Sequence, residues 1–267
     1  MADRLRETLA DAGRVLAMEG HGDYVAGHIS VRLPEDSGRF LMKPAGIGIE
    51  EMRPDNIITV DIEGKKVDGT MPRHNEVFIH SEVLRARSDV QCVIHSHPIH
   101  AVAFSSLGKP LVAVSNAAGY FADGRLPIFS ETTDLIINQE RGKAVARCLG
   151  GHAALILRNH GIVATGGSIA EAVWCAIKLE KACQAQLLAE AAGGQNSSLT
   201  ARTSTTSAAA PIGPICTTTR SATWCGNGAA RAAARSCRRR TSPRLRIRTE
   251  RRTRRSGSRF AASRNDR

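Results

Sequence analysis

Two histidines separated by one residue stand at the end of an apolar segment, in the order Val93-Ile-His-Ser-His-Pro98. Alternate side chains of a β-strand lie on one face, so we expect His95 and His97 to point the same way. Two neutral imidazoles side by side in apolar surroundings need a partner, and a shared divalent cation supplies one. A pair of hydrogen-bonded structural histidines is the alternative, and the spacing favours the metal site.

A third candidate ligand, His160, lies between the apolar segment 155–157 and Gly161. A glycine here allows the backbone to turn tightly and present its neighbour, and strand ends are common places for sites. We therefore predict that His160 joins His95 and His97 on one divalent metal ion.

The candidate acid is Glu76, four residues before His80 and on the same face of an expected helix. Beside a cation, Glu76 would serve as a fourth ligand, as a general base, or as each in turn when substrate displaces it. An ordinary first-turn acid that complements the helix dipole is the alternative.

Hydrophobic periodicity predicts the elements that position these side chains. Strands and helices intermingle without a strict β-α repeat, which indicates one α/β domain with a mixed sheet covered by helices. Ser168 is expected to cap the last helix, with Glu171 bonding back. The expected helices cover 3–19, 75–87, 99–107, 133–149 and 169–192, and the expected strands cover 28–33, 39–43, 57–62, 65–67, 90–97, 111–115, 153–158 and 161–164.

The composition changes after about Gly194, so we predict one domain over 1–194 and a low-complexity tail over 195–267. The net charge is +12, yet residues 196–267 hold 17 Arg, no Lys and two acids, a net +15. The body is therefore mildly acidic, which argues against nucleic acid as its partner. The tail is either a disordered basic segment that touches nucleic acid non-specifically, or the product of a shifted reading frame in a GC-rich gene. We assign it no catalytic role.

Seven scattered cysteines without a C-x-x-C pair are poor material for a disulfide framework and are typical of a reducing compartment. The first residues carry mixed charges and no apolar core of a signal peptide. No apolar run approaches the length of a membrane span. These features predict a cytoplasmic protein without a membrane partner.

Several motifs together resemble the class II aldolase/adducin family over about residues 4–194. They stand in the family's order and spacing, namely Gly27-His-Ile-Ser-Val-Arg32, Lys43-Pro-Ala-Gly-Ile47, Glu76-x-x-x-His80, His95-Ser-His-Pro98 and Asn159-His-Gly161. The resemblance implies a three-layer αβα fold with a mixed, largely antiparallel central sheet. It also implies a homotetramer with active sites near subunit interfaces, and a divalent metal on the three histidines. Zinc is the first expectation, with Mn, Fe, Co or Mg as alternatives.

The chain departs from the family's sugar-phosphate aldolases where those enzymes cradle the phosphate. Larger cationic or imidazole groups replace small hydroxyl and amide donors, which suits a planar carboxylate better. No residue in 111–116 matches the tyrosine that those aldolases use as proton donor. The candidate substrate-binding residues are His28, Ala45, Gly46, Arg73, His74 and, less well aligned, Tyr120.

We therefore expect a metal-dependent carbon–carbon lyase that decarboxylates a hydroxy-aromatic or a hydroxy- or oxo-carboxylic acid. In that reaction the metal chelates two vicinal oxygens and stabilises the enolate or phenolate that remains. Two alternatives stay open. One is an aldolase or epimerase acting on a small sugar or sugar phosphate. The other is a non-catalytic adducin-like interaction module, which the three histidines argue against.

Overall fold

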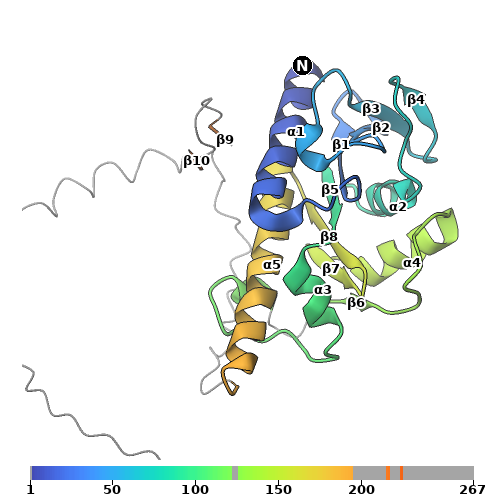
Figure 1. The fold of residues 1–267 in the computed structure, drawn as a ribbon. Coiled ribbons are helices and arrows are strands. Elements are labelled where there is room, and N and C mark those ends of the chain that lie inside the picture. Colours follow the sequence, from blue (N-terminus) through green and yellow to red (C-terminus); the bar gives the residue numbers. More distant parts are fainter. Residues whose placement is uncertain (1, 122–125, 195–214, 217–222, 225–267) are drawn as a thin grey trace, which may run out of the picture. The chain divides into compact units, whose positions relative to one another are not determined.

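A computed structural model describes residues 2–121 and 126–194, together with two short strands at 215–216 and 223–224. An eight-stranded sheet runs through the main domain in the order β4-β3-β2-β1-β5-β8-β7-β6 (Figure 1). Its neighbouring strands are antiparallel except for the pair β6 and β7. The mixed, mostly antiparallel sheet that the sequence predicts is confirmed.

The strands of this sheet are β1 (His28–Leu33), β2 (Asp36–Met42), β3 (Ile58–Asp61), β4 (Lys66–Asp68), β5 (Cys92–Ser96), β6 (Ile128–Phe129), β7 (Ala154–Leu157) and β8 (Gly161–Gly166). The α-helices are α1 (Ala2–Leu16), α2 (Val77–Ala86), α3 (Ile99–Ser105), α4 (Gln139–Leu149) and α5 (Ile169–Ala191). Short helical turns η1 (Ala17–His21), η2 (Ile49–Glu51) and η3 (Ala118–Tyr120) complete the described domain.

The sheet separates two layers of helices. Helices α1, α3 and α5 cover one face, which we call the α5 face, and helices α2 and α4 cover the other, the α2 face (Figure 1). Each face has its own apolar cluster of buried side chains. Alternation along β5 shows the division, because Ile94 belongs to the cluster on the α5 face and Val93 to the cluster on the α2 face.

Local signals explain the two longest helices. Helix α1 buries Leu9, Ala12 and Leu16, as the predicted amphipathic spacing requires. The hydroxyl oxygen of Ser168 accepts a hydrogen bond from the Glu171 N–H and so caps α5. The Glu171 carboxylate bonds back one residue earlier than a capping box requires, to the Gly167 N–H.

Two sequence predictions of elements are wrong. The segment 111–115 is not a strand, and no strand in the described part of the chain pairs with it. The Val112 N–H instead donates to the Gln186 side chain on α5, and Leu111 packs into the cluster on the α5 face. Helix α4 begins at Gln139 rather than at 133, because Asn138 caps it there. The preceding residues form an irregular segment, 130–138, that follows the short, unpredicted strand β6.

The predicted tail lies outside the described residues except for β9 (Ile215–Cys216) and β10 (Thr223–Trp224), which pair antiparallel with each other. The proposed division at residue 194 therefore stays a prediction. Among the described helices, none has both the length and the apolarity that crossing a bilayer demands.

Candidate metal centre

Strands β1 and β5 carry the centre of the site on the α2 face. They pair antiparallel with His28 opposite His95 and Ser30 opposite Val93. The alternate residues of these strands, Ile29 and Ile94 among them, pack into the α5 face. Both histidines are fully buried or nearly so. The pleat therefore directs polar side chains to one side of the sheet and apolar ones to the other.

Four side chains converge where β5 ends. One ligand atom from each of Glu76, His95, His97 and His160 lies within 4.8 Å of every other. The carboxylate oxygens of Glu76 lie 3.6 Å from His95 Nε2 and 3.7 Å from His160 Nε2. Donor atoms around a tetrahedral metal with bonds of ~2.1 Å stand roughly 3.4 Å apart, so these separations are close to those of a metal site.

Hydrogen bonds behind the rings orient His95 and His97 toward each other. His95 Nδ1–H donates to the Ile162 carbonyl at 3.0 Å, and His97 Nδ1–H donates to the Asp23 carboxylate at 2.9 Å. A neutral ring whose proton lies at Nδ1 presents a lone pair at Nε2. The two Nε2 atoms face each other at 3.0 Å, an arrangement of two acceptors that a cation between them stabilises.

His160 Nε2 is a buried nitrogen that has no hydrogen-bond partner among the described residues. Burial, followed by the neighbouring His95, lowers the pKa of His160 to about 4, so the ring is neutral at physiological pH. A buried polar atom without a partner is costly in a folded protein. Its position beside the two facing nitrogens indicates that a third lone pair is available to the same ion.

The turn between β7 and β8 positions His160. The tight backbone comes from Asn159, which has φ 57°, a value that asparagine tolerates. Gly161 has a different role from the predicted one. A Cβ there would lie 2.5 Å from the Ser96 carbonyl oxygen and 2.6 Å from His97 Cδ2. Glycine is therefore required for the close approach of β8 to the ligands rather than for the turn itself.

Glu76 immediately precedes α2 and is buried. The Ile136 N–H, from the segment before α4, donates to its Oε1 at 2.9 Å. Burial opposes ionisation of the carboxyl, but His28 and His95 outweigh it and hold the pKa of Glu76 below its ordinary range. Three imidazole nitrogens and one ionised carboxylate form a donor set that fits a divalent cation.

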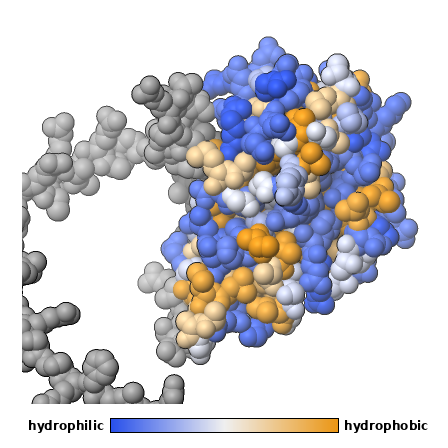
Figure 2. All heavy atoms as spheres, viewed as in Figure 1, coloured by the Kyte–Doolittle hydropathy of each residue, from blue (hydrophilic) through white to orange (hydrophobic). Residues whose placement is uncertain are grey.

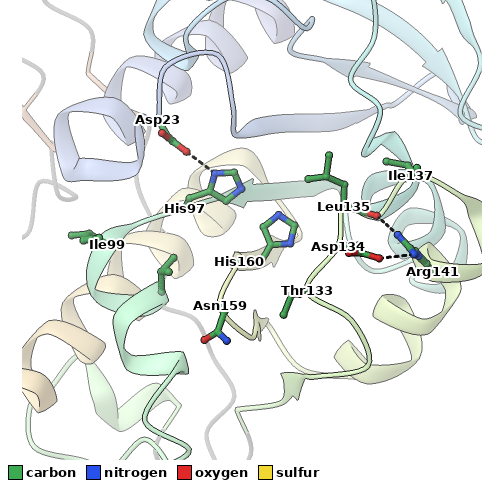
Figure 3. Close-up of a pocket in the computed structure, with 11 residues that line it drawn as sticks. Asp23, His97, Ile99, Thr133, Asp134, Leu135, Ile137, Arg141, Asn159 and His160 are labelled. Carbon is green, nitrogen blue, oxygen red and sulfur yellow. Dashed lines mark hydrogen bonds and ion pairs between the residues drawn. The ribbon is translucent and has the colours of Figure 1, made fainter.

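A cavity of about 890 Å³ opens beside this cluster. His97 and His160 line it, with Asp23 hydrogen-bonded to His97 at the edge (Figure 3). Arg141 lies across the cavity and pairs with Asp134 at 2.9 Å (Figure 3). Apolar side chains form much of the remaining wall, namely Ile99, Val102, Leu135 and Ile137.

The apolar wall continues onto the surface of the molecule. Figure 2 shows hydrophobic surface gathered over α3, the helix that contributes Ile99. Ile99, Leu135 and Ile137 are all exposed large hydrophobic residues. The mouth of the cavity therefore offers an apolar surface to a ligand.

A buried lysine borders the cluster beyond His28. Lys43 Nζ donates to the Val25 and Pro44 carbonyls and lies 3.1 Å from His74 Nε2. The His74 ring in turn lies 4.5 Å from the His28 ring. Burial lowers the pKa of Lys43 to about 8, and no carboxylate forms an ion pair with it in the described part of the chain.

The predicted substrate-binding residues separate into two groups. His28 and His74 lie beside the cluster, and a hydrogen bond from the Ala45 N–H to the Pro72 carbonyl joins the two loops that flank it. Arg73 instead donates to the His74 carbonyl and stacks over Phe78. These contacts turn its guanidinium to its own loop, and its binding of a substrate carboxylate stays a prediction.

The other two predicted positions lie at the surface. Gly46 is exposed in a turn with φ 86°. Tyr120 is exposed, packs edge-on against Trp174 of α5, and is absent from the cavity wall. The role of Tyr120 in substrate binding therefore stays a prediction.

Sequence reasoning missed Asp23, Lys43 and the Ile136 N–H. Asp23 is 74 residues from the histidine it contacts, and its segment has no periodic pattern. A signal was present for Lys43, since a lysine that follows a strand-like apolar run and precedes proline is an unusual buried charge.

Comparisons with known proteins identify a family whose domain covers this site. The Class II Aldolase and Adducin N-terminal domain matches residues 7–187. Decarboxylase NovR of Streptomyces niveus is 35% identical over 174 residues, which are 64% of this chain and 64% of that protein, slightly less than two thirds of each. The 3,4-dihydroxyphthalate decarboxylase of Arthrobacter keyseri is 31% identical over 199 residues, covering 71% of this chain and 80% of that protein.

The fold is also similar to solved structures. The L-fuculose 1-phosphate aldolase from Glaciozyma antarctica PI12 superimposes with a TM-score of 0.65 at 36% sequence identity, covering 74% of this chain and 76% of that one. The matched region contains Glu76 and the three clustered histidines. This chain belongs to the class II aldolase and adducin family, which includes metal-dependent aldolases and decarboxylases.

Proposed function

We propose that this protein is a zinc-dependent decarboxylase of hydroxylated carboxylic acids, with hydroxy-aromatic acids as its first substrate class. The observation that carries the proposal is the convergence of three imidazole lone pairs and Glu76 beside a cavity with apolar walls. His95, His97 and His160 would hold the ion. When bound there, a divalent cation supplies Lewis-acid polarisation of an oxygen next to the bond that breaks.

The protein's own groups prepare the site for this chemistry. Asp23 and the Ile162 carbonyl hold the two facing rings in the tautomer that presents Nε2. The Ile136 N–H holds Glu76 between the histidines, where the carboxylate would be a ligand or would accept a proton from a substrate hydroxyl.

The walls of the cavity favour a ring over a sugar. A sugar presents hydroxyl groups on most of its carbons, and each needs a hydrogen-bond partner when it is buried. Ile99, Val102 and Leu135 offer none from their side chains, whereas they suit the face of an aromatic ring. The similarity to a 3,4-dihydroxyphthalate decarboxylase supports the same substrate class, because that name gives a hydroxylated aromatic acid.

The buried lysine beside the cluster supports an anionic substrate. Lys43 has no carboxylate partner among the described residues, and its Nζ lies 3.1 Å from His74 Nε2. An anionic oxygen near this end of the site would offset that charge. We propose that this anion is the carboxylate of the substrate and that Lys43, rather than Arg73, lies near it.

An aldolase is the second candidate, because the polar residues Thr133, Asp134 and Asn159 also line the cavity and an aldolase structure is 36% identical. Those side chains would pair with sugar hydroxyls. An aldolase would split its substrate into an aldehyde and an enolisable partner and would catalyse the reverse condensation.

The deciding experiment begins with metal analysis of the purified full chain, followed by a screen for CO2 release from ortho-hydroxylated aromatic acids. We expect about one divalent ion per chain, release of CO2, loss of turnover with a chelator, and recovery with Zn²⁺. A purified protein that binds no divalent ion would contradict the metal site. Aldehyde formation from sugar phosphates, with no CO2 from any acid, would overturn the decarboxylase and favour the aldolase.

A further inference from the structure

A chain of three hydrogen-bonded side chains lies on the α2 face behind the metal cluster. Ser30 Oγ lies 2.7 Å from His80 Nδ1, and His80 Nε2 lies 2.6 Å from His28 Nδ1. Ser30 and His80 are fully buried, and His28 is 1% exposed. The far nitrogen of His28, Nε2, lies 3.9 Å from Glu76 Oε2, so the chain ends at the reactive side of the site.

The 2.6 Å contact between His80 Nε2 and His28 Nδ1 requires one of these nitrogens to donate and the other to accept, so the two cannot both carry a proton. A neutral imidazole has one N–H and one lone pair. The chain therefore has two possible directions, and the direction decides whether His28 presents a donor or an acceptor to the site.

The Ser30 end of this hydrogen-bonded series favours one direction. If the Ser30 hydroxyl donates to His80 Nδ1, then His80 Nε2–H donates to His28 Nδ1, and His28 keeps its proton at Nε2. In the opposite direction Ser30 would accept from His80, and its own hydroxyl proton would need another acceptor. No second partner for Ser30 Oγ is present in the described residues. A buried donor left unpaired is unfavourable in a folded protein.

The open end favours the same direction. A lone pair on His28 Nε2 would face the carboxylate oxygen of Glu76, and two acceptors repel each other. An N–H at that position faces a negative charge instead. The separation of 3.9 Å exceeds hydrogen-bonding distance, so this N–H remains free for another acceptor.

We infer that Ser30 and His80 are positioning residues that hold His28 in its Nε2–H form, so that His28 donates a hydrogen bond to an anionic oxygen of the bound acid. This inference rests on the proposed function for the identity of the acid. The direction of the chain rests on the geometry alone.

The direction can be measured without substrate. In the full-length protein labelled with ¹⁵N-histidine, protonated and unprotonated ring nitrogens resonate far apart, and couplings to the ring protons distinguish Nδ1 from Nε2. We expect His28 to carry its proton at Nε2 and Ser30→Ala to shift part of the population to Nδ1. A His28 ring that is protonated at Nδ1 in the wild type would overturn the inference, whatever the enzyme's reaction proves to be.

Binding of a probe acid measures the consequence. His80→Gln keeps an N–H that can reach His28 Nδ1, whereas His80→Leu removes it. For 2-hydroxybenzoate and the Zn²⁺-loaded protein, we expect calorimetry to give an affinity near wild type for His80→Gln. His80→Leu should weaken binding ~10-fold or more at unchanged zinc content. His152→Gln is the matched control, because His152 does not belong to the hydrogen-bonded series of Ser30, His80 and His28.

These outcomes separate the two proposals. Equal affinity for His80→Leu and wild type would contradict a positioning role for His80. If no acid releases CO2 while His28 is found in its Nε2–H form, the decarboxylase fails and the hydrogen-bond direction stands. A wild type that does not bind 2-hydroxybenzoate would overturn the assignment of His28 as a donor to the bound acid, and the ring-nitrogen measurement would still decide the direction of the hydrogen bonds.

Discussion

The two faces of the β1–β5 pair differ sharply although they share the same backbone. On the α5 face, Ile29 and Ile94 pack into a continuous apolar cluster. On the α2 face, His28 and His95 stand one residue away and join a network of hydrogen bonds. Because the side chains alternate, the apolar residues of one face stabilise the fold and the polar residues of the other face form the candidate site.

The difference lies in what each face demands of its residues. An apolar cluster tolerates exchange among side chains of similar volume. The polar network does not, because each buried donor needs an acceptor at the right place. His97, for example, depends on Asp23, and Glu76 depends on the Ile136 N–H. Substitutions on the two faces should therefore fail in different ways.

The largest difference is expected between His95→Ala and its neighbour Ile94→Ala. His95→Ala removes a ligand, so metal content should fall to near zero and turnover should be abolished. Ile94→Ala should cost ~2–5 kcal/mol of unfolding free energy and keep the metal, since Ile94 is fully buried on the opposite face. Elemental analysis and urea unfolding of both variants test the contrast. Stoichiometric metal in His95→Ala would show that the ligand assignment is wrong.

Glu76→Gln should separate catalysis from folding. The amide oxygen of glutamine can still accept from the Ile136 N–H, so we expect unfolding free energy close to wild type. Removing the carboxylate charge should lower kcat ~10²- to 10⁴-fold, as for loss of a general base. Steady-state kinetics at saturating Zn²⁺ measures this, and an unchanged kcat would remove Glu76 from the mechanism.

Asp23→Asn is expected to have a smaller effect. Asp23 orients the His97 ring from behind and raises its basicity, and loss of such a group weakens metal affinity ~10–100-fold. Asp134→Asn is the control, because Asp134 lines the same cavity but pairs with Arg141. Competition with a zinc indicator gives both affinities. Equal weakening in the two variants would assign the effect to lost charge in the cavity rather than to His97.

The cluster could be predicted from the sequence where a local pattern encodes it. The H-x-H spacing at His95 and His97 has a period of two, and the structure brings both rings together with Glu76 and His160. The mixed, largely antiparallel sheet and the layers of helices could be expected from the family resemblance. Tertiary contacts between distant segments have no such pattern. Asp23 reaches His97 across 74 residues, and the approach to Ser96 that requires Gly161 depends on how β8 packs against β5.

Errors in the predicted elements have the same origin. The apolar run 111–115 has the composition of a strand, but its N–H groups find a side-chain partner in Gln186 instead of a neighbouring strand. The predicted start of α4 at 133 ignored Asn138 as a cap, and the segment freed by that cap supplies Ile136 to the site. Tertiary contacts therefore override local propensity in both segments.

The smallest expected effect concerns pH, and it also divides the two faces. Burial lowers the pKa of His21, His74 and His160 to about 4, against ~6.5 in an unfolded chain. Between these values the unfolded chain binds protons that the folded chain does not, so unfolding free energy should fall as pH drops from 6.5 toward 4. Each such histidine contributes a slope of at most ~1.4 kcal/mol per pH unit.

His21 is the member of this group that contacts the α5 face, through Ser96. In metal-free protein, His21→Gln should therefore reduce the slope by no more than one proton and leave the larger part, which comes from the α2 face. Urea unfolding between pH 7 and 5 in the presence of a chelator measures both slopes. A wild type that is equally stable at both pH values would contradict the neutral state of these rings. If the unfolding free energy of His21→Gln does not change between pH 7 and 5, the pH sensitivity comes from His21 on the α5 face and not from the histidines of the α2 face.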